Sequence, residues 1–100
     1  MHITLVKKIM EDGNLCPKCR EVSEQIAHDN HLDKVNYIAI ADASDNESEG
    51  MRLANRFKAK CTPFFVIEFM DGRVKIIELY SDFKQFLEDS ASNVQLEELA

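Results

Sequence analysis

Two cysteines stand three positions apart near the start of the chain, in the sequence Cys16-Pro17-Lys18-Cys19. This spacing suits dithiol redox chemistry, because a thiolate is the group that attacks a disulfide. Unpaired N–H groups and the positive end of the helix dipole stabilise a thiolate at a helix N-terminus. We expect Cys16 at the N-cap, Pro17 at the first helical position, where a missing N–H costs nothing, and Cys19 one turn further on. The second sulfur then lies within reach of the first.

The two cysteines are expected to differ in role. Cys16 is predicted to be the exposed nucleophile, with its pKa lowered from about 8.5 into the range of about 3.5–7.5 that such motifs show. Cys19 should face inward beside Val22 and resolve the mixed disulfide. Lys18, followed by Arg20, either supports the thiolate and attracts acidic partners or is a solvated helix residue, since exposed charges often interact weakly.

A zinc site is the alternative for this motif, because Cys-Pro-x-Cys also opens zinc ribbons and knuckles. A tetrahedral site needs four ligands, and the remaining candidates are Cys61, His28 and His31. The two histidines follow Cys19 by nine and twelve positions, which is not the usual zinc-finger separation, and the chain has no second CxxC. They are more simply explained as favourable partners of the negative end of the first helix. Dithiol chemistry, with no bound metal or cofactor, is therefore the favoured interpretation.

Composition narrows the class of protein. One hundred residues with 45% hydrophobic content predict a single domain over residues 1–100, with its core at about 2–90 and a tail at 91–100. A net charge of −6 and the lack of any Lys/Arg run longer than two argue against nucleic acid as a partner. The apolar start is interrupted at Lys7-Lys8, too early for a signal peptide or a membrane span. We expect a monomer in the cytoplasm, where a CxxC pair is more often catalytic or metal-binding than structural.

Hydrophobic periodicity predicts alternating strands and helices in the first half of the chain. The apolar positions of the first helix recur to about Asn30. The second strand is almost continuously apolar, so we expect both of its faces to be covered. The predicted elements are a strand at 2–10, a helix from Cys16 to about Asn30, a strand at 35–41 and a helix at about 47–58.

The second half predicts a hairpin and a last helix. Apolar runs at 64–69 and 74–79 flank Asp71-Gly72, a strong signal for an antiparallel hairpin. The last helix is expected to begin with Ser81 as its N-cap. Beyond Asp89 the tail forms either one more short helix, with Ser92 as its cap, or a frayed end. The predicted order is β-α-β-α-β-β-α.

The chain resembles the thioredoxin-like superfamily, because its CxxC motif lies between the first strand and the first helix of this series. The resemblance covers about residues 2–90 and is to the short form used by glutaredoxins and small glutaredoxin-like thioredoxins. The proline directly after Cys16 resembles glutaredoxin, whereas residues 61–65, Cys-Thr-Pro-Phe-Phe, resemble thioredoxin. The resemblance implies an α/β thioredoxin-like fold in which a central four-stranded mixed sheet is flanked by helices.

The same resemblance implies a small thiol-disulfide oxidoreductase. It would need no cofactor and would reduce protein or low-molecular-weight disulfides through Cys16 and Cys19. The alternative from another class is a non-catalytic binding module of this fold, in which the cysteines hold zinc or contact a partner.

Thr62-Pro63 and Cys61 acquire expected roles from the resemblance. X–Pro bonds are cis in only about 5–6% of folded cases, so the residues alone favour trans. Thioredoxin-like proteins, however, keep a cis proline facing the CxxC, and the residue before it offers main-chain groups to an extended substrate. Pro63 is then expected to be cis and Thr62 to be the substrate-pairing residue. Cys61 is either a buried, inert thiol, the ordinary state of a lone cysteine, or an accessory thiol with a redox-sensitive or partner-linking role, because the loop before the cis proline is generally exposed near the catalytic groove.

The chain departs from both families at positions that concern the electron donor. Leu15, rather than Trp, precedes Cys16, and the chain contains no Trp. The Gly-Gly pair and the lysine that glutaredoxins use for glutathione are replaced by Leu79-Tyr80-Ser81-Asp82 and Gly13-Asn14-Leu15. We therefore expect a thioredoxin-reductase-like flavoenzyme or another protein dithiol to reduce the protein better than glutathione does.

Overall fold

A four-stranded sheet lies between helices in the computed structural model, which describes residues 1–99 of the chain and the side chains of residues 1–90. The elements follow in the order β1 (His2–Ile9), α1 (Pro17–His28), a 3₁₀ turn (Leu32–Lys34), β2 (Tyr37–Asp42), α2 (Glu49–Phe57), β3 (Phe64–Glu68), β4 (Val74–Ile77) and α3 (Tyr80–Leu99). No helix within the described residues is long and apolar enough to cross a membrane.

The sheet is mixed and its strands are ordered β2-β1-β3-β4. β1 and β2 run parallel because α1 carries the chain back between them, whereas β3 pairs antiparallel with both β1 and β4. In this register Leu5 of β1 lies between Ile38 of β2 and Phe65 of β3. The predicted α/β class, element order and four-stranded mixed sheet are confirmed.

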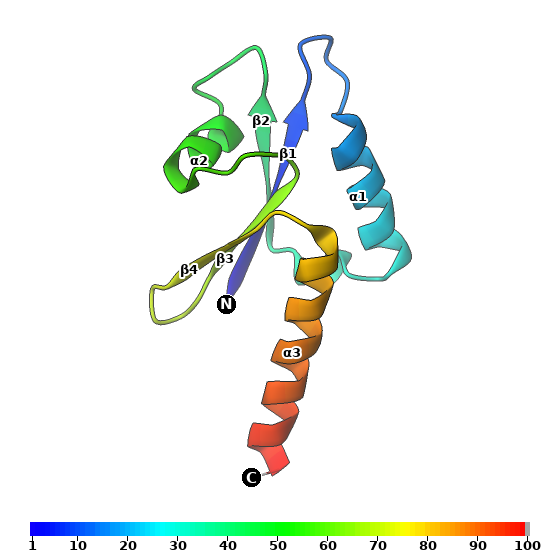
Figure 1. Ribbon diagram of the computed structural model, residues 1–100, viewed down its shortest axis with the longest axis vertical. Helices are drawn as coiled ribbons and strands as arrows, with labels where there is room; N and C mark the ends of the chain where they lie inside the picture. Colours follow the sequence, from blue (N-terminus) through cyan, green and yellow to red (C-terminus); the bar gives the residue numbers. More distant parts are fainter. Residues whose placement is uncertain (100) are drawn as a thin grey trace.

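Each face of the sheet is covered by different helices (Figure 1). On one face Val22 and Ile26 of α1 and Phe83 of α3 pack on buried side chains of β1 and β3. The rings of Phe65 and Phe83 stack with centroids 3.9 Å apart. On the other face α2 packs on β2 and β1, where Val6 is fully buried. The central residues of β1, Ile3 to Val6, are therefore buried between two apolar layers.

The expectation that both faces of β2 are covered is wrong. Ala39 and Ala41 are buried under α2, but Ile38 and Ile40, on the other face, are 41% and 37% exposed. β2 is an edge strand, and the apolar side chains of α1 pack on β1 and β3 instead. The continuous apolar run predicted that both faces of β2 are buried, but an edge position in the sheet leaves one face partly exposed.

The expectation that Ser81 caps the last helix is also wrong, because α3 already begins at Tyr80. The Tyr80 hydroxyl donates a hydrogen bond of 2.8 Å to Oδ2 of Asp29, beyond the end of α1, and this contact places the first turn of α3 against α1. Lys84 Nζ lies 3.4 Å from the same carboxylate oxygen. At its other end α3 continues unbroken to Leu99, past Ser92, where a separate short helix was one of two expectations.

Candidate active site

Cys16 occupies the N-cap of α1, as the sequence predicts, and Pro17 begins the helix. The loop before it is tied to the sheet, because the Cys16 N–H donates to the carbonyl of Lys8 at 2.9 Å. The Cys16 carbonyl accepts the first helical bond from Arg20 at 3.0 Å. The position of the Cys16 sulfur is thus set by β1 on one side and by α1 on the other.

The environment of Cys16 favours its thiolate. Main-chain N–H groups at the start of α1, first that of Cys19 and then that of Lys18, lower the pKa of the Cys16 thiol below its ordinary value. Partial burial opposes this shift, while the Cys19 and Thr62 side chains add to it. These are the donors that a helix N-terminus leaves unpaired, so the stabilisation follows from the cap position.

Cys19 lies in the opposite environment. Its side chain is fully buried on the inner face of α1, and its sulfur accepts the Lys8 N–H at 3.3 Å. Burial raises the pKa of the Cys19 thiol, and the neighbouring Cys16 raises it further, although the Lys8 N–H and Thr62 act in the other direction. The helix start thus favours the thiolate of Cys16, whereas burial favours the protonated form of Cys19.

Thr62 and Pro63 lie beside the two thiols. The Thr62–Pro63 peptide bond is cis, the isomer that the resemblance implied. Pro63 is buried directly before β3, whose first residue, Phe64, pairs with Val6 of β1. The Thr62 side chain is near enough to both sulfurs to lower the pKa of each. The tertiary structure thus places Thr62 next to cysteines that precede it by more than forty positions.

Cys61 is exposed, so the interpretation of it as a buried thiol is wrong. Its Sγ lies 3.9 Å from Oε1 of Glu78, and the same oxygen accepts the Lys60 N–H at 2.7 Å. Partial burial and the Glu78 carboxylate raise the pKa of Cys61, with the Lys18 ammonium acting in the opposite direction. Cys61 is thus a thiol at the rim of the site that resists ionisation.

Lys18 supports Cys16 through its main chain rather than through its ammonium group. Its Nζ lies 3.8 Å from Oε2 of Glu21 on the exposed side of α1. By contrast, the Lys18 N–H contributes to the lowered pKa of Cys16. A hollow of about 730 Å³ borders the same end of the helix, and its apolar lining includes Met10, Leu15 and Pro17.

Two contributors to the site were not identified in the sequence. The main-chain N–H of Lys8 binds the Cys19 sulfur, and Glu78 contacts both Lys60 and Cys61. A main-chain donor has no residue-type signature. Glu78 is separated from Lys60 by eighteen positions and follows an ordinary strand pattern, so no local signal relates the two.

His28 and His31 lie at the far end of α1 from the CxxC. His28 Nδ1 is 3.4 Å from Oδ1 of Asp29, and His31 Nδ1 is 3.1 Å from the hydroxyl of Tyr80. Within the part of the chain whose side chains are described, no three Cys, His, Asp or Glu side chains are grouped as metal ligands. The zinc-ligand candidates are therefore distributed over different ends of the molecule.

Comparison with known proteins supports the fold. No protein-family model and no curated protein sequence matches the chain. Among solved structures, the solution structure of a thioredoxin from Thermus thermophilus matches with a TM-score of 0.53 and 19% sequence identity. The match covers 90% of this chain and 74% of that one. The chain thus has a thioredoxin-like fold, with a CxxC at the start of its first helix.

The different environments of the three thiols predict different rates of alkylation. Below about pH 7 iodoacetamide should modify Cys16 much faster than Cys61, because only Cys16 has a lowered pKa and the thiolate is the reactive form. The ratio of the two rates should fall as the pH rises and Cys61 ionises. Mass spectrometry of peptides after timed alkylation measures both rates, with Cys16→Ser as the control that lacks the fast phase. Faster labelling of Cys61 at low pH would contradict the assignment.

Proposed function

We propose that the protein is a small thiol-disulfide oxidoreductase that reduces protein or low-molecular-weight disulfides through Cys16 and Cys19. The observation that supports this most is the opposite environment of the two neighbouring thiols. The N–H groups of the helix start lower the pKa of Cys16, and burial raises that of Cys19. A dithiol that reduces disulfides needs this difference, because one sulfur must attack first and the other must wait.

The reaction proceeds in two exchanges. The Cys16 thiolate attacks one sulfur of the substrate disulfide, and the other substrate sulfur leaves as a thiolate and takes up a proton. Cys19 then loses its proton and attacks Cys16 Sγ, which forms the Cys16–Cys19 disulfide and releases the second substrate thiol. Two electrons pass from the protein dithiol to the substrate, and two thiols are produced.

Thr62 and Pro63 are proposed to hold the substrate during the first exchange. Thr62 is half-buried beside both sulfurs, and its main chain turns at the cis bond before β3 begins. An extended segment next to the substrate disulfide would pair with main-chain groups of Thr62 and so bring its sulfur to Cys16. Substrates would then be recognised first by backbone shape and only secondarily by side chains.

We place this activity in the cytoplasm, where the reducing environment keeps thiols free for exchange. The electron donor is proposed to be a thioredoxin-reductase-like flavoenzyme or another protein dithiol. Glutathione recognition in glutaredoxins uses a Gly-Gly loop before the last helix, and here Tyr80 at this place anchors α3 to Asp29. Side chains thus occupy positions where glutathione would need close approach to the main chain.

Assays of the oxidised protein with two donors test both the activity and the donor. We expect turnover of a protein disulfide with the flavoenzyme system and slower turnover with glutathione and its reductase at matched driving force. A redox titration on the same preparation gives the potential of the Cys16–Cys19 couple. Faster turnover with glutathione would overturn the donor proposal. Absence of turnover with either donor, together with one equivalent of bound zinc that chelator removes as the protein unfolds, would establish the binding-module alternative.

A further inference from the structure

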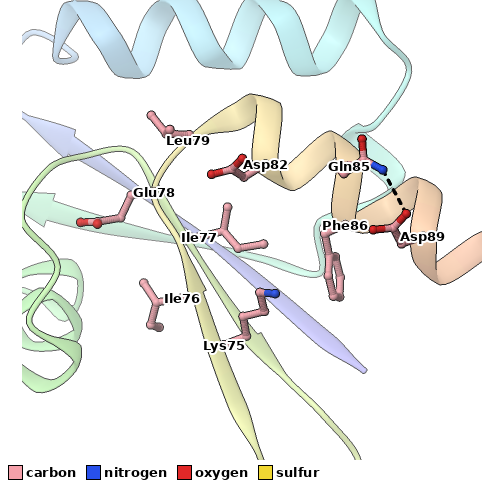
Figure 2. A pocket seen from close by; sticks show the side chains of 9 residues that line it. All are labelled: Lys75, Ile76, Ile77, Glu78, Leu79, Asp82, Gln85, Phe86 and Asp89. Atoms are coloured by element: carbon pink, nitrogen blue, oxygen red, sulfur yellow. Dashed lines mark hydrogen bonds between the residues drawn. The ribbon is translucent and has the colours of Figure 1, made fainter.

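A groove of about 490 Å³ lies between β4 and the first turns of α3 (Figure 2). One wall is the end of β4, Lys75 to Ile77, with Glu78 and Leu79 after it, and the other consists of side chains of α3. Ile77 and Phe86 provide an apolar floor, and Leu79, which is 55% exposed, stands at the upper end. An exposed leucine beside a buried apolar floor gives this groove a surface that can bury part of a partner.

The groove and the candidate active site have Glu78 as a common neighbour. Glu78 belongs to the groove lining and is also the residue whose carboxylate lies 3.9 Å from Cys61 Sγ. Cys61 directly precedes Thr62, which lies beside Cys16 and Cys19. Glu78 therefore links the end of the groove to the segment Cys61–Thr62, along which a chain bound at Cys16 would continue.

The charged groups of the groove are mostly acidic. Two carboxylates, from Asp82 and Asp89, line it against one ammonium group, that of Lys75. The Glu78 carboxylate points away from α3 (Figure 2) and binds the Lys60 N–H instead. Among the side chains of residues 1–90, neither Asp82 nor Asp89 has a cationic partner within 4.0 Å, although Gln85 donates a hydrogen bond of 3.0 Å to Asp89. Two carboxylates on one side of α3 thus face the groove without a neutralising charge, which favours a cationic occupant.

The strand side of the groove suits an extended chain. β4 is the edge of the sheet and pairs only with β3 among the strands that the structure describes. Main-chain groups on the outer side of an edge strand can pair with an added segment, while its side chains fit into neighbouring pockets. The groove thus combines a strand edge, an apolar floor and an acidic wall.

We propose that this groove binds an extended, basic segment of the protein whose disulfide the enzyme reduces. The proposal rests on the proposed function and adds a substrate class to it, namely protein disulfides with Lys or Arg residues close to one cysteine. The aliphatic parts of these side chains lie on Ile77, Leu79 and Phe86, and their charged ends meet the carboxylates of Asp82 and Asp89.

A pair of peptide disulfides tests the proposal. The two peptides are identical except that Lys residues flank the cysteine in one and Glu residues in the other. We expect kcat/KM for the basic peptide to exceed that for the acidic peptide by about threefold to tenfold at low salt, as a few exposed charge pairs would give. The preference should decrease as ionic strength rises, because salt screens exposed charges.

Matched variants of α3 identify the groove as the source of the preference. The double variant Asp82→Asn and Asp89→Asn should reduce the preference to about twofold or less, with unchanged turnover of the uncharged bis(2-hydroxyethyl) disulfide. Glu88→Gln is the control, since it removes the same charge from an exposed position of α3 outside the groove lining. Equal kcat/KM for the two peptides, or a preference that persists in the double variant, would overturn the proposal.

Turnover of the uncharged disulfide distinguishes failure of the proposed function from failure of the groove proposal. If the protein turns over no disulfide, the oxidoreductase assignment fails. Binding of a basic peptide in which Ser replaces the cysteine then tests the groove proposal independently of the reaction. Binding that weakens in the Asp82→Asn, Asp89→Asn variant and not in Glu88→Gln would support the groove. No binding, or binding that neither variant changes, would refute it.

Discussion

Replacement of Cys16 by Ser is expected to reduce disulfide reduction by at least about a thousandfold, because the attacking thiolate is lost. Cys19→Ser should lose turnover as well, but for a different reason. Cys16 can still attack, whereas no second thiol resolves the intermediate, so a mixed disulfide between Cys16 and the substrate accumulates. Non-reducing electrophoresis and mass spectrometry of the protein with substrate measure this adduct.

Cys61→Ser is the matched control for both variants, because it removes a third, exposed thiol near the same site. In the wild type the pKa of Cys61 is raised and its sulfur lies beside Glu78, so Cys61 is not expected to take part in the reaction. The Cys61→Ser variant should therefore retain turnover. Full activity in Cys16→Ser would contradict the proposed chemistry. Loss of activity in Cys61→Ser alone would transfer the role of nucleophile to Cys61.

Gly50→Ala is expected to destabilise the fold strongly. Gly50 is buried in the first turn of α2, where the helix meets β2. A Cβ at this position would lie 2.5 Å from the carbonyl carbon of Ile40 and 2.6 Å from Cα of Ala41, and would overlap the main-chain nitrogen of Ala41. These are main-chain atoms of the sheet, so relief requires α2 to move away from β2.

The sign of this effect separates packing from helix propensity. Alanine favours a helix over glycine by about 1 kcal/mol, whereas overpacking of a core costs about 1–3 kcal/mol and occasionally more. We therefore expect Gly50→Ala to lower the free energy of unfolding. Each kcal/mol lost should lower Tm by about 4–8 °C in a domain of this size. Thermal unfolding followed by circular dichroism measures it. Arg52→Ala, at an exposed position of the same helix, is the control and should change Tm little. A Tm above that of the wild type in Gly50→Ala would show that α2 packs less closely on β2.

Local patterns in the sequence were sufficient where a feature depends on a few neighbouring residues. The cap position of Cys16 and the inward position of Cys19 follow from one helical turn, whose N–H groups point back at the first sulfur. The β3–β4 hairpin follows in the same way from Asp71-Gly72, since Gly72 adopts a φ of 92° that most residues avoid. In both cases residues that are neighbours in the sequence determine the local conformation, without contacts to distant residues.

Features that depend on strand order and on distant contacts were decided only by the tertiary structure. The apolar pattern of β2 indicated a strand but not that Ile38 and Ile40 face outward at an edge, because the pattern does not record which helix covers which strand. The structure begins α3 at Tyr80, whose hydroxyl donates a hydrogen bond to the distant Asp29. Sequence patterns also do not predict the contact of Glu78 with Cys61 or the acidic groove between β4 and α3. Such contacts arise when the sheet brings separate segments side by side, and their electrostatics exist only once the sheet has formed.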